Sequence, residues 1–240
     1  MGFNNFTGGS NPPSNNNSAI PPIGGTPISF PPMGGDTIDV NDYIINYNEK
    51  FKNAGPCLFR DEIVHQTLAV LIGKNHPNAL LVGAAGVGKT KIAEDIAYRL
   101  ANNDPLIPDK LKGCTIYELP LSNIVAGSGI VGQIEEKIKA VIDFMTDPKN
   151  KAIMFIDEIH VLVGDSQTYE KIAQILKPAL ARNDMHVIGA TTLQESNNFL
   201  DDPALSRRFS RLIVDELSRE QTIEILKNSK ASFFKHYNNK

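Results

Sequence analysis

Several features that would point to other kinds of protein are missing from this 240-residue sequence. It contains only two cysteines, Cys57 and Cys114, without a C-x-x-C pair, which argues against a disulfide scaffold and a cysteine metal site. No apolar run approaches membrane-spanning length, and the first residues lack the basic and apolar regions of a signal peptide. The net charge is −3 and Lys and Arg cluster only modestly, near the C-terminus, so nucleic acid is an unfavoured partner. We expect a cytoplasmic protein without membrane partners, whose two thiols lie in its core.

The composition predicts one α/β core flanked by tails. With 41% hydrophobic and 21% charged residues, the chain can build one sizeable core, whereas a second full domain would be cramped. Residues 1–38 are rich in Asn, Gly, Pro and Ser, and such a segment cannot offset its own ordering entropy. We expect a disordered N-terminal tail at 1–38, a core at 39–217 and a short final segment at 218–240. Alternatively, the tail binds a partner through its apolar residues, which are Phe3, Phe6, Ile23, Phe30 and Met33.

Apolar runs and helical patterns alternate through the core. The expected strands are residues 79–82, 115–119, 152–156, 186–190 and 212–214. The expected helices are residues 42–52, 63–71, 92–100, 134–144 and 169–181, with a last helix opened by a capping box of Ser218 and Gln221. Because strands that alternate with helices form parallel sheets, the sequence predicts a three-layer α/β fold around a central parallel five-stranded sheet.

A glycine-rich segment after the first of these strands fits the P-loop pattern G-x-x-x-x-G-K-[ST]. In such a loop, backbone N–H groups and the start of a helix converge on phosphates. Lys89 is expected to reach the β and γ phosphates, and Thr90 to offer its hydroxyl to Mg²⁺. The segment consists of Gly83, Ala84, Ala85, Gly86, Val87, Gly88, Lys89 and Thr90. It predicts a P-loop NTPase fold and a nucleoside triphosphate ligand.

Two carboxylates follow the strand expected at 152–156. Asp157 is expected to hold Mg²⁺, and Glu158 to orient and deprotonate the water that attacks the γ-phosphate. By itself, an apolar run followed by two acidic residues is a common way for a strand to reach solvent. The P-loop upstream favours the catalytic interpretation, because ligands of doubly wound folds bind at this end of the strands.

Three further residues are weaker catalytic candidates. Thr192 follows the strand expected at 186–190 and would help to position water, although threonine is common at strand ends. Arg207 and Arg208 are either a solvated surface pair or an arginine finger, which enters a neighbouring subunit's site and stabilises charge on the transferred phosphoryl group. The finger interpretation requires an oligomer.

These motifs, in this order, resemble the AAA+ superfamily, and most closely the first nucleotide-binding module of the Clp unfoldases. The resemblance covers about residues 43–227, and its further motifs are Arg60-Asp61-Glu62, Asn75-His76-Pro77, Asp157-Glu158-Ile159-His160 and residues 176–182. It implies ATP hydrolysis with Mg²⁺ in a self-assembled ring, expected to be a hexamer, that unfolds a protein substrate. It also implies that the loop with Cys57, Leu58 and Phe59 contacts adenine, although Phe59 stands where the family usually has glycine.

The sequence departs from the Clp pattern at two places. The loop that carries a lysine-aromatic-arginine-glycine run in Clp unfoldases reads Gly129-Ile130-Val131-Gly132, so it is either a weaker substrate-gripping loop or a flexible connector. The chain also ends about a dozen residues after Lys227, so most of the family's helical lid is expected to be missing. The family's second ATPase module is expected to be missing as well. Either the chain is one part of a split machine, in which a partner chain supplies the lid, or it is a truncated or minimal ATPase. Residues 230–240 mix aromatic and basic side chains, as in nucleic-acid contacts, but we expect a partner-facing or frayed end there.

Three functions therefore compete. The first is an ATP-hydrolysing Clp-type module that remodels proteins. The second is an ATP-binding adaptor or assembly subunit that moves no polypeptide. The third, a DNA-associated AAA+ loader, is disfavoured by the acidic balance of the chain. The fold alone cannot choose among them.

Overall fold

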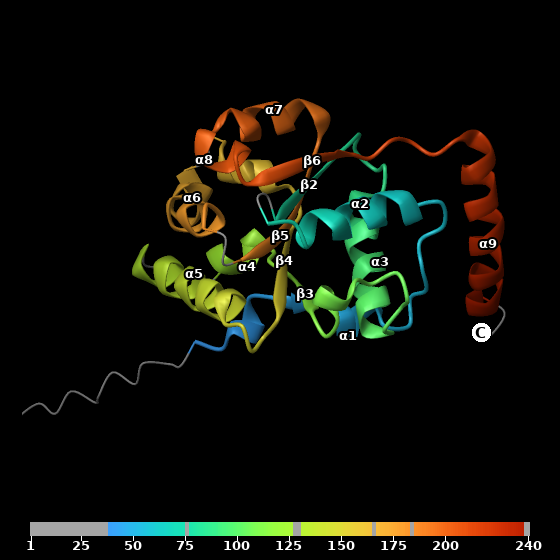
Figure 1. The fold of residues 1–240 in the computed structure, drawn as a ribbon, viewed down its shortest axis with the longest axis horizontal. Helices are drawn as coiled ribbons and strands as arrows, with labels where there is room; N and C mark the ends of the chain where they lie inside the picture. Colours follow the sequence, from blue (N-terminus) through green and yellow to red (C-terminus); the bar gives the residue numbers. More distant parts are fainter. Residues whose placement is uncertain (1–37, 75–76, 127–130, 165–166, 183–184, 238–240) are drawn as a thin grey trace, which may run out of the picture. The chain divides into compact units, whose positions relative to one another are not determined.

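The computed structural model describes residues 38–74, 77–126, 131–164, 167–182 and 185–237. Its centre is a six-stranded sheet with the strand order β1-β3-β4-β5-β2-β6 (Figure 1). The strands are β1 (Ile45–Asn46), β2 (Asn78–Val82), β3 (Thr115–Glu118), β4 (Ala152–Ile156), β5 (His186–Thr191) and β6 (Phe209–Ile213). The α-helices are α1 (Tyr47–Phe51), α2 (Asp61–Leu71), α3 (Lys89–Ala101), α4 (Leu121–Val125), α5 (Val131–Thr146), α6 (Gln167–Leu180), α7 (Leu193–Asp201), α8 (Pro203–Ser206) and α9 (Arg219–Tyr237). The short 3-10 helices are η1 (Val40–Asp42), η2 (Asp109–Leu111) and η3 (Ile159–Leu162).

The predicted parallel sheet is confirmed by β2 to β6, which all pair in parallel. Successive residues of a strand point to opposite faces, so β2 places Leu80 in one hydrophobic cluster and Leu81 in another. The Leu80 cluster includes residues of α5, α6, α7 and α8, whereas the Leu81 cluster includes residues of α1, α2 and α3. Helices therefore cover both faces, which is the predicted three-layer arrangement.

The sheet has one strand that the sequence did not predict. The helix expected over residues 42–52 is wrong in its first half, because β1 pairs antiparallel with β3 and places Ile45 opposite Glu118. Asn46 then caps α1, since its side chain accepts the N–H of Glu49 at 3.1 Å. At the other edge, β6 begins at Phe209 instead of residue 212, because Phe209 is buried and pairs with Asn78.

The strand order decides where polar residues meet. β5 lies between β4 and β2, and the three strands run in the same direction. The segments that follow them, from Gly83, Asp157 and Thr192, therefore leave the sheet at one edge. This edge carries the candidate site.

Two further expectations concern the ends of the core and its thiols. The capping box that opens α9 is confirmed, since Ser218 N–H donates to Gln221 Oε1 at 2.9 Å and Gln221 N–H donates to Ser218 Oγ at 3.2 Å. The two thiols differ from the expectation in their burial: both are free and half-buried, Cys114 packs against the edge of the core, and Cys57 belongs to neither core cluster.

Other expectations fall partly on residues that are not described. The predicted tail up to residue 37, residues 75–76 of the Asn-His-Pro motif and residues 129–130 of the candidate substrate-gripping loop lie outside the described residues. Gly132 from that loop belongs to α5. Among the described residues, no helix combines the length and the apolar character needed to cross a bilayer.

Candidate functional site

The P-loop connects the end of β2 to the start of α3. At two of its positions, the backbone geometry explains why the residue is glycine. A Cβ on Gly83 would lie 2.4 Å from the carbonyl oxygen of Val214, so only glycine allows this close approach to the chain after β6. Gly88 has φ +99°, a left-handed conformation that side chains rarely adopt, and it is the N-cap of α3. The loop therefore leads directly into a helix N-terminus, which favours anion binding.

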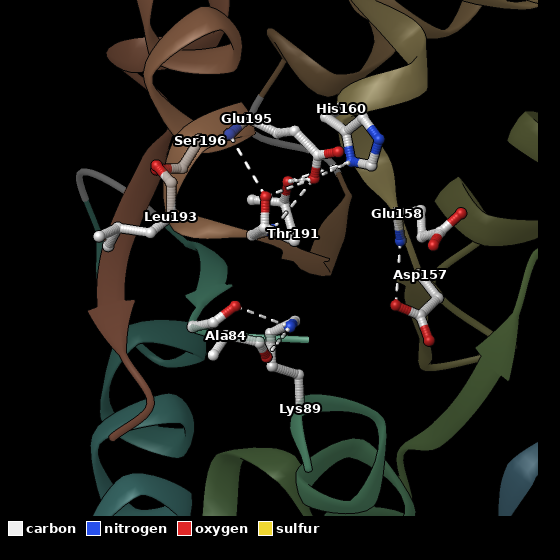
Figure 2. A network of polar contacts seen from close by, with 11 residues as sticks. Ala84, Lys89, Asp157, Glu158, His160, Thr191, Leu193, Glu195 and Ser196 are labelled. Atoms are coloured by element: carbon white, nitrogen blue, oxygen red, sulfur yellow. Dashed lines mark hydrogen bonds and ion pairs between the residues drawn. The ribbon is translucent and has the colours of Figure 1, made fainter. Parts of the chain in front are cut away.

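Lys89 is held inside this loop. Its ammonium donates to the carbonyl oxygens of Gly83 and Ala84, both at 2.9 Å (Figure 2). These partners are neutral backbone groups, so an anionic phosphate oxygen would be a stronger acceptor for the same cation.

Thr90 and Asp157 come together from separate elements. Thr90 Oγ1, in the first turn of α3, donates to Asp157 Oδ2 at 2.7 Å, and Asp157 directly follows β4. The other carboxylate oxygen of Asp157 accepts the N–H of Glu158 at 3.0 Å (Figure 2). A hydroxyl and one carboxylate are oxygen donors of the kind that Mg²⁺ accepts when phosphates and water complete its shell. No cluster of three or more His, Cys, Asp or Glu residues that could hold a metal occurs in the described parts of the chain.

Glu158 has an unusual backbone conformation. Its φ is +51°, in the left-handed region, and it is the N-cap of η3. Non-glycine residues rarely adopt this conformation, and such strain is concentrated at functional sites. The exposed side chain lines two adjoining cavities, one with the P-loop and one of about 230 Å³ with Ser122 and Tyr169.

One cavity of about 370 Å³, which we call the P-loop cavity, gathers most of the predicted site. Its predicted residues are Ala85, Gly86, Gly88, Lys89, Thr90, Asp157, Glu158 and Thr192. Its other lining residues, which were not predicted as site residues, are Lys91, His160, Thr191 and Glu195; His160 belongs to the family motif that begins at Asp157.

Three of these residues, His160 of η3, Thr191 at the end of β5 and Glu195 of α7, form one polar network with Thr192 (Figure 2). His160 Nδ1 lies 3.1 Å from Thr191 Oγ1 and 3.2 Å from Glu195 Oε2. The Thr192 hydroxyl donates to the same Glu195 oxygen at 2.6 Å. The T-x-x-E spacing of Thr192 and Glu195 is a capping-box signal that the sequence carries. Only the fold brings His160 to this pair.

A second cavity, of about 490 Å³, adjoins the P-loop where the resemblance places adenine. It is bounded by the segment from Ala54 to Leu58, by Val87 and Gly88 of the P-loop, and by Leu217 and Ile225 before and within α9. Leu58 lines this cavity. Cys57 also lines this cavity, and burial raises the pKa of its thiol.

Phe59 is not among the lining residues of this second cavity, and it is 40% exposed. Its φ is +60°, which glycine adopts freely and a bulky side chain does not. This conformation explains why a glycine suits the position, and it gives Phe59 a strained backbone.

Arg60 joins the P-loop to the segment that leads toward α9. This buried guanidinium donates to the carbonyl oxygens of Val87 at 2.7 Å and Asp215 at 2.9 Å. It therefore supports the wall between the P-loop and the second cavity.

Arg207 and Arg208 lie outside both cavities, in the turn between α8 and β6. Arg207 is exposed and has no hydrogen bond or ion pair with any of the described residues, whereas Arg208 is half-buried and has a partner. The fold does not bring either arginine to the P-loop of its own chain.

Known proteins are similar to this chain in sequence and in fold. Residues 79–217 match the family described as ATPase family associated with various cellular activities (AAA). The chaperone protein ClpB of Dichelobacter nodosus is 42% identical over 185 residues, and that of Meiothermus ruber is 40% identical over 184; each alignment covers 76% of this chain and 21% of the relative.

Solved structures are also similar to this chain. The S. cerevisiae Hsp104:casein complex in its extended conformation matches 83% of this chain and 34% of that one, with 34% identity and a TM-score of 0.74. The S. cerevisiae Hsp104-ADP complex matches 82% and 28%, with 35% identity and a TM-score of 0.74. The chain thus spans about a fifth of the length of the ClpB relatives and about a third of the Hsp104 chains. With its P-loop geometry and a family match over more than half of its residues, the chain belongs to the AAA family of nucleotide-binding ATPases.

Proposed function

We propose that this AAA ATPase hydrolyses ATP in the P-loop cavity, with its side chains in the roles expected from the sequence. The observation that carries the proposal is that Lys89, Thr90, Asp157 and Glu158 line one cavity although they come from two distant segments. Each has the chemistry that its proposed role requires.

Binding begins with the triphosphate at the start of α3. The N–H groups of the loop from Gly83 to Thr90 receive the phosphates, and Lys89 exchanges its two carbonyl partners for phosphate oxygens. The base enters the second cavity beside Leu58, and the exposed Phe59 takes no part in the lining of that cavity. Arg60 holds the wall of that cavity against the P-loop through its hydrogen bonds to the carbonyls of Val87 and Asp215.

Mg²⁺ is the proposed cofactor, held by Thr90 Oγ1 and Asp157 with phosphate and water as its other ligands. When bound, it neutralises charge on the β and γ phosphates. The 2.7 Å contact between the two protein oxygens supports this assignment, because it already places both donors at one point.

Glu158 is the proposed general base and Thr192 the residue that positions the attacking water. Both line the P-loop cavity with Lys89. Arg207, and Arg208 beside it, are proposed to act on the site of a neighbouring subunit. Arg207 is exposed and pairs with none of the described residues, which supports action between subunits. Such action requires a ring or another assembly of copies, expected to be a hexamer.

Protein remodelling in the cytoplasm is the proposed use of this hydrolysis. The support comes from relatives named chaperones and from the solved complex of Hsp104 with casein. Free, half-buried thiols fit a reducing compartment.

The proposal is tested by ATP turnover of the purified chain over a range of protein concentrations, with Glu158→Gln as the control for contaminating ATPases. Turnover per chain should rise with concentration, because the finger must come from another copy, and it should vanish in Glu158→Gln. Nucleotide binding without turnover at any concentration would overturn self-sufficient hydrolysis and favour the adaptor function or a requirement for a partner chain.

A further inference from the structure

The hydroxyl of Thr192 has its only proton committed inside the protein. Thr192 Oγ1 donates to Glu195 Oε2 at 2.6 Å, the shortest hydrogen bond in the network around it. A hydroxyl has one donor and two acceptor lone pairs. Toward the P-loop cavity, Thr192 can therefore act only as an acceptor.

Glu195 is held in place for this bond. The same oxygen, Oε2, lies 3.4 Å from Thr191 Oγ1, 3.2 Å from His160 Nδ1 and 3.3 Å from the N–H of Thr192. All four residues line the P-loop cavity. The hydrogen bond from the Thr192 side chain lowers the pKa of the Glu195 carboxyl, so this group is a charged acceptor at neutral pH.

Helix capping alone does not account for this arrangement. The two bonds that define the capping box are long, at 3.4 Å from Glu195 N–H to Thr192 Oγ1 and 3.3 Å from Thr192 N–H to Glu195 Oε2. The bond between the two side chains is much shorter, and a capping box does not require it. It fixes the direction of a hydroxyl whose residue borders the proposed reaction site.

We propose that Glu195 is a positioning residue for ATP hydrolysis: it accepts the hydrogen bond that the Thr192 hydroxyl donates, so that Thr192 accepts a hydrogen bond from the attacking water. That water then gives one hydrogen bond to Thr192 and the other to Glu158, which leaves an oxygen lone pair for the γ-phosphate. Without Glu195, the freed hydroxyl proton turns to a phosphate oxygen and the water loses one acceptor. This inference rests on the proposed function.

Four variants of the full chain test it: Glu195→Ala, Glu195→Gln, Thr192→Val and the double variant Glu195→Ala with Thr192→Val. Glu195→Ala should lower kcat about tenfold and leave KM within about twofold, because misorientation of the water affects the reaction more than binding. Glu195→Gln keeps an oxygen acceptor and the capping box, so its kcat should stay within about threefold of wild type. The double variant should be no slower than Thr192→Val, because Glu195 acts through that hydroxyl. Melting curves establish that every variant is folded at the assay temperature.

A binding measurement separates this inference from the proposed function. Affinity for ADP with aluminium fluoride and Mg²⁺, which mimics the transferred phosphoryl group and its water, should fall about tenfold in Glu195→Ala, with ADP affinity unchanged. If the wild-type chain binds this complex but does not turn over ATP, self-sufficient hydrolysis is refuted. The comparison of wild type with Glu195→Ala in binding the complex still tests the role of Glu195. Equal losses for ADP and the complex, or losses that multiply in the double variant, would overturn the positioning role. Wild-type chain that binds neither would overturn both proposals.

Discussion

Gly83→Ala should be a destabilising substitution, although it adds only one methyl group. The new Cβ would meet the carbonyl oxygen of Val214 at 2.4 Å and Val87 Cγ1 at 3.0 Å. The first contact is with backbone that is fixed by the hydrogen bond from Val214 N–H to the carbonyl of Val82 at 2.8 Å, so no rotamer change relieves it. Either the P-loop or the chain after β6 must shift.

Overpacking of this kind costs about 1–3 kcal/mol in the free energy of unfolding. For a folded unit of this size, that loss lowers the melting temperature by about 2 to 12 °C. The shift also moves the loop that receives the phosphates, so nucleotide affinity should fall together with stability. Thermal melting followed by circular dichroism, and titration with a fluorescent ATP analogue, measure the two effects.

Two other glycines provide matched controls. Gly132→Ala in α5 meets no atom within 4 Å, and alanine favours helix, so this variant should be as stable as wild type or slightly more stable. Gly189→Ala meets only side-chain atoms within 3.4 Å, the nearest being Ile159 Cδ1 at 2.9 Å, so its cost should lie between the other two. A Gly83→Ala chain that melts with wild type and binds nucleotide normally would refute the close approach to Val214.

Three further predictions concern single side chains. Arg60→Ala should lower the free energy of unfolding by about 1.5–3 kcal/mol in urea titrations, because the carbonyls of Val87 and Asp215 lose a charged donor; an unchanged midpoint would contradict this. Arg207→Ala should lower kcat on the order of a thousandfold in the assembled protein and spare ATP affinity, and normal turnover would exclude a finger role. The lowered pKa of Glu195 means that its ionised form stabilises the fold above its usual pKa of 4.5 and that this stability is lost as pH falls through the folded pKa. As the pH is lowered from about 5 to 3, the melting temperature of Glu195→Gln should therefore fall less than that of wild type. Equal falls in the two proteins would contradict a lowered pKa of Glu195.

Local sequence patterns predicted the parallel strands because each is apolar, short and followed by a helical period. β1 escaped prediction because its two residues are strand only by pairing with β3, about seventy residues later in the chain. Of the helix expected over residues 42–52, the structure forms the part that Asn46 caps, which is α1 (Tyr47–Phe51).

The candidate site divides in the same way. The P-loop and the pair Asp157 and Glu158 are contiguous motifs, so the sequence predicted their meeting at one cavity. The contact of His160 with Thr191 and Glu195 joins residues that are 31 or more positions apart, and no periodic pattern encodes it. The strained backbone of Phe59 and the close approach at Gly83 are likewise visible only in three dimensions.

The fate of bound nucleotide tests the central claim most directly. Wild-type chain, Glu158→Gln and Lys89→Ala are each incubated with radiolabelled ATP and Mg²⁺, separated quickly from free nucleotide, and analysed for what remains bound. The account predicts ADP on the wild type, intact ATP on Glu158→Gln and no nucleotide on Lys89→Ala. Intact ATP on the wild type, or ADP on Glu158→Gln, would contradict hydrolysis by the residues of this cavity.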